Sequence, residues 1–227
     1  MPKSSNPLLY AFVPFTLAFL LGCQSAEWYD LVGEPPDVVP GVTPPSVRIE
    51  QLRQLADEAA SRTPEQREKV AQELSGEIVH EKDAMIRAHI VRTLASYPTE
   101  TGRAVMRRAL RDPDRLVRMA ACDAWGQVGD SEAVERLGKT LERDADVDVR
   151  LAAVRALGRT REPSAVAALG GALDDKDPAM QYRAMESLAE LTGENLDSVS
   201  EWRQYVASGR RPERQPTSVA ERWFDLF

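Results

Sequence analysis

The sequence has few of the residues on which most enzyme sites depend. Its 227 residues include only two histidines and two cysteines, and they contain no P-loop, no dinucleotide-binding glycine motif and no nucleophile elbow. Neither His80 nor His89 lies at metal-ligand spacing from a cysteine or a carboxylate in a known motif. We therefore predict no catalytic residue, no metal and no cofactor, and these absences favour a protein that is not an enzyme.

Aromatic residues are also scarce, and the net charge has the wrong sign for a nucleic-acid-binding protein. Aromatic side chains make up 6% of the chain, charged residues 29%, and the net charge is −7. Domains that bind nucleic acids are usually basic. The abundance of alanine, leucine, arginine and glutamate favours helices over strands. We expect an all-α protein and no nucleic-acid partner.

One acidic segment imitates the start of a calcium-binding loop. Asp144, Asp146 and Asp148 have the spacing of the first ligands of such a loop. Val149 and Arg155 stand where the loop would need glycine and glutamate. The pattern therefore predicts an acidic turn beside a helix N-terminus, where the helix dipole favours negative charge.

The first residues are typical of an export signal. Lys3 precedes an apolar run over 8–21, which is shorter than the ~20 residues of a transmembrane helix. The run ends in Leu20-Leu21-Gly22-Cys23, which resembles the lipobox of bacterial lipoproteins. The resemblance implies that residues 1–22 are a signal peptide and that Cys23 carries a thioether-linked diacylglycerol with acyl chains such as palmitate.

The lipobox resemblance also implies a location, although two alternatives stay open. Cleavage after Ala26 would discard Cys23, and an uncleaved signal would make it an ordinary residue of a membrane anchor. Gln24 rather than aspartate follows Cys23, which favours the outer membrane over the inner one in a cell with two membranes. We expect a protein of the cell envelope that is anchored to a membrane by lipid.

Residues 23–46 are rich in proline and are predicted to form a tether. Extended polyproline chain rises ~3.1 Å per residue, so the segment could reach about 70 Å. The simplest interpretation is a spacer that holds the folded part away from the membrane. Alternatively, Trp28 and Tyr29 dock on a partner or lie at the lipid interface.

The strongest pattern is an internal repeat. Aspartates at intervals of 31 or 32 residues each precede an amphipathic helix, and they are Asp83, Asp114, Asp146 and Asp177. A second apolar stripe fits each period, so one repeat holds two helices. Breakers between the helices are Pro98, Gly126 with Gly129, Gly158 with Pro163, and Gly193.

Two further helices precede the first clear repeat. One is expected over 47–60, and a capping box at Thr63 and Gln66 opens another that ends at about Glu81. With these, the sequence predicts about five helix pairs over 47–208. A single pair cannot bury its apolar face, so the pairs must stack into an α-solenoid.

The phrases "VRMAACDAWGQVGDSEAVERL" and "VRLAAVRALGRTREPSAVAAL" carry a family resemblance. They resemble the short HEAT-like repeats of phycobilisome-lyase-related proteins. This resemblance implies a right-handed superhelix of antiparallel helix pairs. It also implies an alternative function as a bilin lyase or another ligand-handling enzyme. A DNA-binding relative of the alkylpurine glycosylases is disfavoured by the export signal and the acidity.

Two features inside the repeat have both a structural and a functional interpretation. An arginine stands four residues after each of the first three aspartates, at Arg87, Arg118 and Arg150. These arginines could hold an acidic ligand, but pairing with the aspartate four residues earlier or with a neighbouring repeat is favoured. Cys122 occupies an apolar position of the repeat, which predicts a buried thiol rather than a nucleophile.

The end of the chain carries aromatic residues that the repeat lacks. Trp202 and Tyr205 share a helix face and are expected to cap the apolar core, with a partner-binding patch as the alternative. Residues 209–227 form a predicted tail with a short amphipathic helix. That helix either folds back on the solenoid or docks on a partner, and the candidate partner-binding residues are Trp223, Phe224 and Phe227.

The sequence therefore predicts a lipid-anchored envelope protein whose HEAT-like solenoid acts as an adaptor or scaffold for a protein partner. The bilin-lyase type of enzyme remains the alternative.

Overall fold

The computed structural model of the protein describes residues 44–212. This part of the chain folds into helices and contains no strand. The helices are α2 (Pro45–Asp57), α3 (Pro64–His80), α4 (Ala84–Ala95), α5 (Glu100–Ala109), α6 (Arg115–Val128), α7 (Ser131–Arg143), α8 (Val147–Gly158), α9 (Ala165–Ala172), α10 (Pro178–Thr192) and α11 (Val199–Ser208), and a 3-10 helix, Glu58–Ser61, follows α2.

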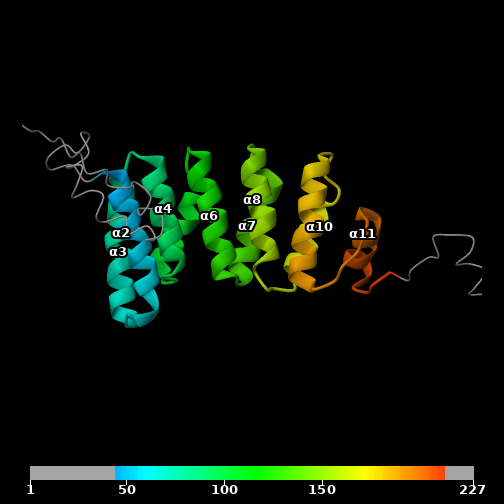
Figure 1. Ribbon diagram of the computed structural model, residues 1–227, viewed down its shortest axis with the longest axis horizontal. Coiled ribbons are helices and arrows are strands. Elements are labelled where there is room, and N and C mark those ends of the chain that lie inside the picture. Colours follow the sequence, from blue (N-terminus) through cyan, green and yellow to red (C-terminus); the bar gives the residue numbers. More distant parts are fainter. Residues whose placement is uncertain (1–43, 213–227) are drawn as a thin grey trace, which may run out of the picture. The chain divides into compact units, whose positions relative to one another are not determined.

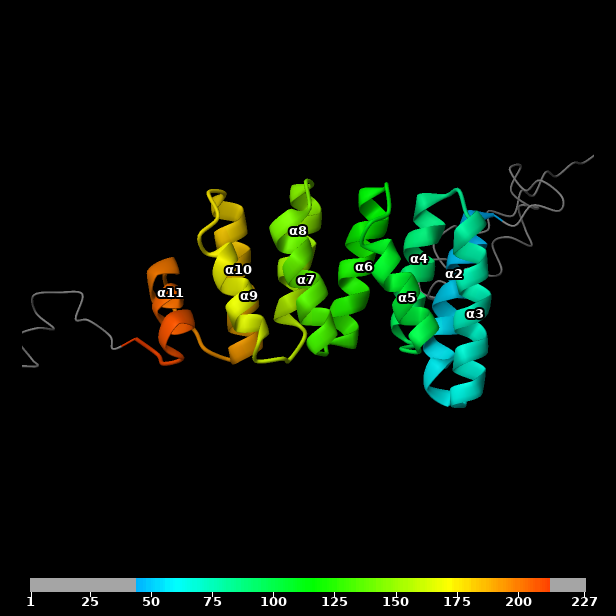
Figure 2. The same cartoon turned by 180° about the vertical axis from the view of Figure 1, so that it is seen from behind.

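The helices stack in two rows. Figure 1 shows one row, in which α2, α4, α6, α8 and α10 lie side by side. The second row, with α3, α5, α7 and α9, is nearer the viewer in Figure 2, which shows the molecule from the opposite side. Consecutive helices form antiparallel pairs, and each pair packs on the next. The described residues hold five such pairs, so the predicted all-α solenoid is confirmed.

Aspartate side chains start the helices of one row. Asp83 accepts a hydrogen bond from the backbone N–H of Met85, and Asp114, Asp146 and Asp177 do the same two residues ahead of themselves. A capping side chain satisfies a backbone donor that the first helical turn leaves free. The repeated aspartates of the sequence are therefore N-caps. The predicted capping box is also present, because Thr63 and Gln66 bond each other's backbone N–H groups.

Small residues let the helices of that row approach closely. A Cβ atom added at Gly126 would lie 3.0 Å from the Cα of Ala156, and one at Gly158 would lie 2.8 Å from the Cβ of Ser187. Gly126 was predicted to break the chain between helices, but it lies inside α6. The helix ends instead at Gly129, whose φ of 68° is left-handed. Glycine is favoured at 126 because α8 passes so near that even a Cβ atom would require the backbone at Ala156 to shift.

The core runs between the two rows and is closed at the C-terminal end. Cys122 of α6 is buried in this core, and its burial raises the pKa of the thiol to about 12, as expected for a structural cysteine. At the end of the solenoid, Trp202 of α11 is 1% exposed and meets the ring of Tyr205 edge-on. Val206 lies against Gly170 of α9. Trp202 and its neighbours therefore cap the core, as predicted.

Several sequence predictions fall outside the described residues. The signal peptide, nearly all of the tether, Cys23 and the aromatic residues Trp223, Phe224 and Phe227 belong to this group. Between residues 44 and 212, no helix is both long and apolar enough to cross a membrane.

Candidate functional site

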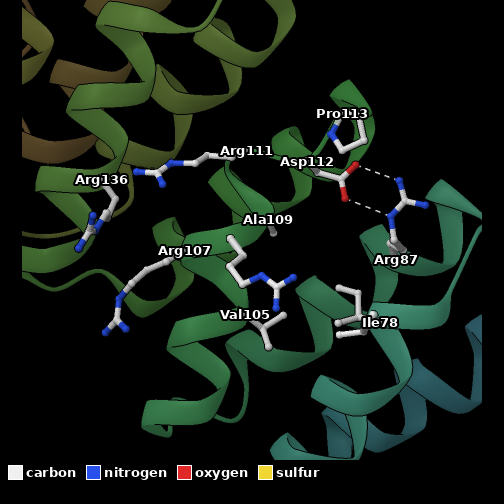
Figure 3. Close-up of a pocket in the computed structure, with 11 residues that line it drawn as sticks. Ile78, Arg87, Val105, Arg107, Ala109, Arg111, Asp112, Pro113 and Arg136 are labelled. Atoms are coloured by element: carbon white, nitrogen blue, oxygen red, sulfur yellow. Dashed lines mark hydrogen bonds and ion pairs between the residues drawn. The ribbon is translucent and has the colours of Figure 1, made fainter.

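A groove of about 530 Å³ lies where α3, α5 and α7 face the turn that leads into α6 (Figure 3). Its lining combines aliphatic side chains with arginines. The aliphatic residues are Ile78, Val79, Val105, Ala109 and Pro113, and the charged residues are Arg87, Arg107, Arg108, Arg111, Arg136 and Asp112.

Helix α5 forms the floor of the groove. Thr99 caps its N-terminus by accepting a hydrogen bond from Gly102. Gly102 is required at that point, because a Cβ atom there would lie 2.5 Å from the carbonyl oxygen of Tyr97. Val105 and Ala109 turn their side chains into the core. The next residues around the helix, Arg107 and Arg108, therefore face outward near the C-terminus of α5, where the helix dipole favours positive charge.

One wall of the groove is a fixed ion pair. The Arg87 guanidinium donates to both carboxylate oxygens of Asp112 at 3.1 and 2.9 Å, and a third bond reaches the carbonyl oxygen of Lys82 at 2.9 Å. The hydrogen bond to the Asp112 carboxylate is the main reason why the pKa of Arg87 is raised. Asp112 also accepts from the backbone N–H of Asp114 at 2.9 Å. The wall therefore holds together three successive segments of the chain.

An equivalent ion pair between an arginine and an aspartate occurs one repeat later. Arg118 donates to Asp144 at 2.9 and 3.2 Å, and Asp144 accepts from the backbone N–H of Asp146. Two arginines of the ladder, Arg87 and Arg118, therefore pair with the turn that leads into the next repeat, not with the aspartate four residues earlier. That earlier aspartate caps the helix instead. The third, Arg150, donates to the backbone carbonyl oxygen of Asp144 at 3.1 Å. The acidic turn is structural, and no group of potential metal ligands is found among residues 44–212.

Two more groove arginines bond the same carboxylate of α7, Glu132: Arg107 reaches it from α5, whereas Arg136 lies one turn further along α7 itself. Arg107 donates to Glu132 at 2.7 Å and to Glu100 at 2.8 Å. Arg136 also contacts Glu132, at 3.4 Å. The hydrogen bond from Arg107 is the main reason why the pKa of Glu132 is lowered, and the charges of Arg107, Arg136 and Arg103 add to it. Glu132 thus fixes these guanidinium groups in place.

The remaining two arginines have no such partner. Arg108 and Arg111 are exposed, and within residues 44–212 neither forms a salt bridge or a side-chain hydrogen bond. Figure 3 shows Arg111 extending across α5 to the side where Arg107 and Arg136 also lie. The groove therefore carries a surplus of positive charge, although the whole chain has a net charge of −7.

These two arginines were not predicted as site residues, although the repeat contains a signal that distinguishes them. In the alignment that places Leu110 on Leu141 and Leu173, Arg111 takes the place of Glu142 and Asp174. Arg108 aligns with Lys139 and Gly171, and Arg107 with Gly138 and Gly170. The second helix of this repeat is therefore more basic than its equivalents. Residues that depart from the pattern of their own repeat are the ones to examine for function.

A second hollow, of about 1190 Å³, lies at the C-terminal ends of α6 and α8. It carries charges of both signs, among them Arg161, Glu162 and Glu190. Arg92 and Arg159 both contact Asp123 in its wall. The exposed Arg161 lies here beside two acidic residues, so the hollow lacks the surplus of positive charge that the groove carries.

The chain has relatives among known families and folds. A family model of HEAT repeats matches residues 71–144 and 134–203, which together make up more than half of the chain. A search of curated proteins finds no match.

Solved structures with a similar fold include two proteins of low sequence identity. The complex of CpcE and CpcF of phycocyanin lyase from Nostoc is 19% identical, with a TM-score of 0.50 over 72% of this chain and 68% of that chain. Human deoxyhypusine hydroxylase in complex with glycerol is 20% identical, with a TM-score of 0.47 over 74% of this chain. This chain spans about half of the hydroxylase, with 54% of that chain covered.

These comparisons correct one sequence prediction. The prediction that the protein is not an enzyme, made from the absence of familiar catalytic motifs, is wrong, because the phycocyanin lyase complex has a similar fold. A helical repeat fold gives no evidence against catalysis, since activity depends on individual residues that the fold carries. The fold and the matched repeats nevertheless agree on the family, and the chain belongs to the HEAT repeat family.

Proposed function

We propose that this protein is a HEAT-repeat binding subunit of the cell envelope. In this proposal, a lipid on Cys23 anchors the chain to a membrane, residues 24–46 give the body reach, and the solenoid binds a protein partner. The observation that carries the proposal is the groove over α3, α5 and α7, which places aliphatic and arginine side chains together on the surface. Arginine and apolar residues are a common combination in protein interfaces.

The anchor has a direct test in the cells that make the protein. In cells supplied with a labelled palmitate analogue, Cys23→Ala should abolish the labelling of the protein, because no acyl chain can then be attached. Cys122→Ala is the control, and it should leave the protein labelled. Labelling of the Cys23→Ala protein would contradict a lipid on Cys23.

The binding role is tested by site-specific photo-cross-linking in the same cells. A photoreactive residue is placed at Val79 in the groove, at Tyr182 on α10, or at Arg161 near the second hollow, all of which are exposed. We expect one discrete cross-linked protein, recovered in the presence of light and strongest from the groove position. Equal, weak labelling of many proteins from all three positions would contradict a binding subunit.

A second candidate function is a ligand-handling enzyme of the lyase type. The observation that favours it is the fold similarity to phycocyanin lyase, whose structure is a complex of CpcE and CpcF. In this case the chain would act on its ligand as one subunit of an assembly. A change in the visible absorbance of a bilin on addition of the protein with its cross-linked partner would support this candidate. An unchanged spectrum would exclude a bilin as the ligand.

A further inference from the structure

We infer that the groove binds an acidic, extended segment of the protein partner, and that Arg108 and Arg111 provide the charge for its recognition. This inference rests on the proposed binding function and specifies its site and the chemistry of the partner.

The groove arginines differ in whether the fold already uses their charge. Arg87, Arg107 and Arg136 all bond carboxylates of the protein itself. The fold already uses these three: Arg87 links α4 to the turn before α6, Arg107 links α5 to α7, and Arg136 pairs with a glutamate one turn earlier on α7 itself. Arg108 and Arg111 link nothing among residues 44–212. Their guanidinium groups remain free to donate two parallel hydrogen bonds each to a carboxylate of another molecule.

An exposed apolar surface lies beside the unpaired arginines. Val79 at the C-terminal end of α3 is 56% exposed, although most large aliphatic residues of the body are buried. Ile78, which is partly exposed, continues this surface into the groove. A small inorganic anion would leave these side chains in water. A ligand that carries both carboxylates and aliphatic side chains would cover them and gain free energy from their burial.

The groove is long enough to hold a short extended peptide. It reaches from α3 over α5 to Arg136 on α7, and so crosses three helices of one row. Packed helices lie ~8–10 Å apart, so this path is roughly 20 Å long. An extended peptide rises ~3.3 Å per residue, so about six residues would fill the path. Because alternate side chains of such a peptide point to opposite sides, the segment can turn one set toward the aliphatic floor and the other toward the arginine rim.

The surrounding charges favour the same ligand. Glu132 and Glu100 lie on the side of the groove where Arg107 and Arg136 neutralise them. Asp112 is likewise occupied by Arg87. The groove therefore offers no unpaired carboxylate to attract a basic segment. A basic partner would also meet the guanidinium groups of Arg108 and Arg111, which would repel it.

The test uses the full mature protein, solubilised in detergent, and three synthetic octapeptides with a neutral dye. One peptide alternates leucine with glutamate, the second replaces glutamate by glutamine, and the third replaces it by lysine. Fluorescence anisotropy measures the Kd of each. We expect a Kd below about 100 μM for the glutamate peptide and a Kd at least tenfold weaker for the other two. The binding of the glutamate peptide should weaken as salt is raised.

Two variants locate the binding. Arg108→Gln combined with Arg111→Gln should weaken the glutamate peptide at least tenfold. Arg159→Gln combined with Arg161→Gln removes the same charge beside the second hollow, and it should change the Kd less than twofold. Equal binding of the three peptides, no binding at 1 mM (roughly ten times the expected Kd), or equal loss in both double variants would overturn the inference.

The outcomes also separate this inference from the proposed function. A discrete partner that cross-links in cells through Tyr182 or Arg161, while the glutamate peptide fails to bind, would leave the binding function in place and remove the acidic segment. Binding of the peptide at the groove without any discrete cross-linked protein would support the site and contradict the proposed function.

Discussion

In the row formed by α4, α6, α8 and α10, neighbouring helices approach so closely that a Cβ atom added at Gly126 or Gly158 would force the facing helix to shift. In the other row, α5 and α7 rarely bring their Cα atoms within 8 Å of each other, and charged side chains bridge the gap between them. Both rows come from the same repeat. The comparison teaches that small residues close a surface, whereas long charged residues hold one open and leave space for a ligand.

The largest expected change in stability comes from a substitution in the closely packed row of α4, α6, α8 and α10. Gly158→Val would place a branched side chain where even a Cβ atom lies 2.8 Å from Ser187. We expect the free energy of unfolding to fall by about 3 kcal/mol, because overpacking forces α8 and α10 apart. Urea unfolding followed by circular dichroism measures this change.

The matched control for that variant is Gly171→Val on α9, where an added Cβ atom meets nothing within 4 Å. It should change the stability by less than about 0.5 kcal/mol. Similar losses in both variants would mean that the close approach of the helices is not what selects glycine at 158.

The second prediction tests the ladder that joins the repeats. Arg118→Ala should destabilise the protein by about 2 kcal/mol, since it leaves the nearly buried Asp144 carboxylate without its partner. The neighbouring Arg115 pairs with Asp148 at a site where both side chains are about half exposed. Arg115→Ala should therefore cost less than about 0.5 kcal/mol. Thermal unfolding of the two variants side by side would contradict this difference if their midpoints coincide.

The third prediction concerns pH and the open row. The pKa of Glu132 is lowered from its ordinary value of 4.5 by the hydrogen bond from Arg107. A lowered pKa in the folded state means that the ionised form stabilises the fold. This contribution is complete above pH 4.5 and is lost as the pH falls through the folded-state pKa, below that value.

Glu132→Gln should therefore cost about 1 kcal/mol at pH 7 and should make the stability depend less on pH below 4.5. Glu186→Gln, on an exposed pair with Arg183, is the control and should cost less than about 0.5 kcal/mol at pH 7. An unchanged acid dependence in Glu132→Gln would contradict the role of Glu132 as the fixed point between α5 and α7.

The smallest expected effect on stability belongs to the groove arginines. Arg108→Glu combined with Arg111→Glu should change the free energy of unfolding by less than about 0.5 kcal/mol, because neither side chain bonds another residue of the described body. Guanidinium chloride unfolding measures this change. A loss above about 2 kcal/mol would show that these arginines belong to the fold and are not available to a partner.

Much of the fold was predictable because helical repeats are local. The spacing from Asp83 to Asp177 gave the helix starts, and these aspartates are N-caps because a carboxylate satisfies free N–H groups within two residues of itself. The capping box at Thr63 and the buried Cys122 follow from equally local patterns. Gly126 could not be assigned in this way, since its reason lies in α8, thirty residues further along the chain.

The candidate site was much less predictable. Arg107, Arg108 and Arg111 are close in sequence, but Arg136 and Ile78 come from other helices, and only folding brings them to one groove. The sequence could not show which arginines the fold would consume, because Glu132 and Asp112 pair with residues some 25 positions away. The distinction between Arg87 and Arg108 is therefore a result of the tertiary structure.

The sequence by itself determined the helices, their caps, the repeat and the family, because these depend on contacts within one or two turns and on a periodic apolar stripe. The tertiary structure decided which side chains are neutralised and which remain available, because electrostatic partners meet only after the rows have stacked. It also decided where the surface is open, since the distance between neighbouring helices depends on the size of the residues that face each other across them.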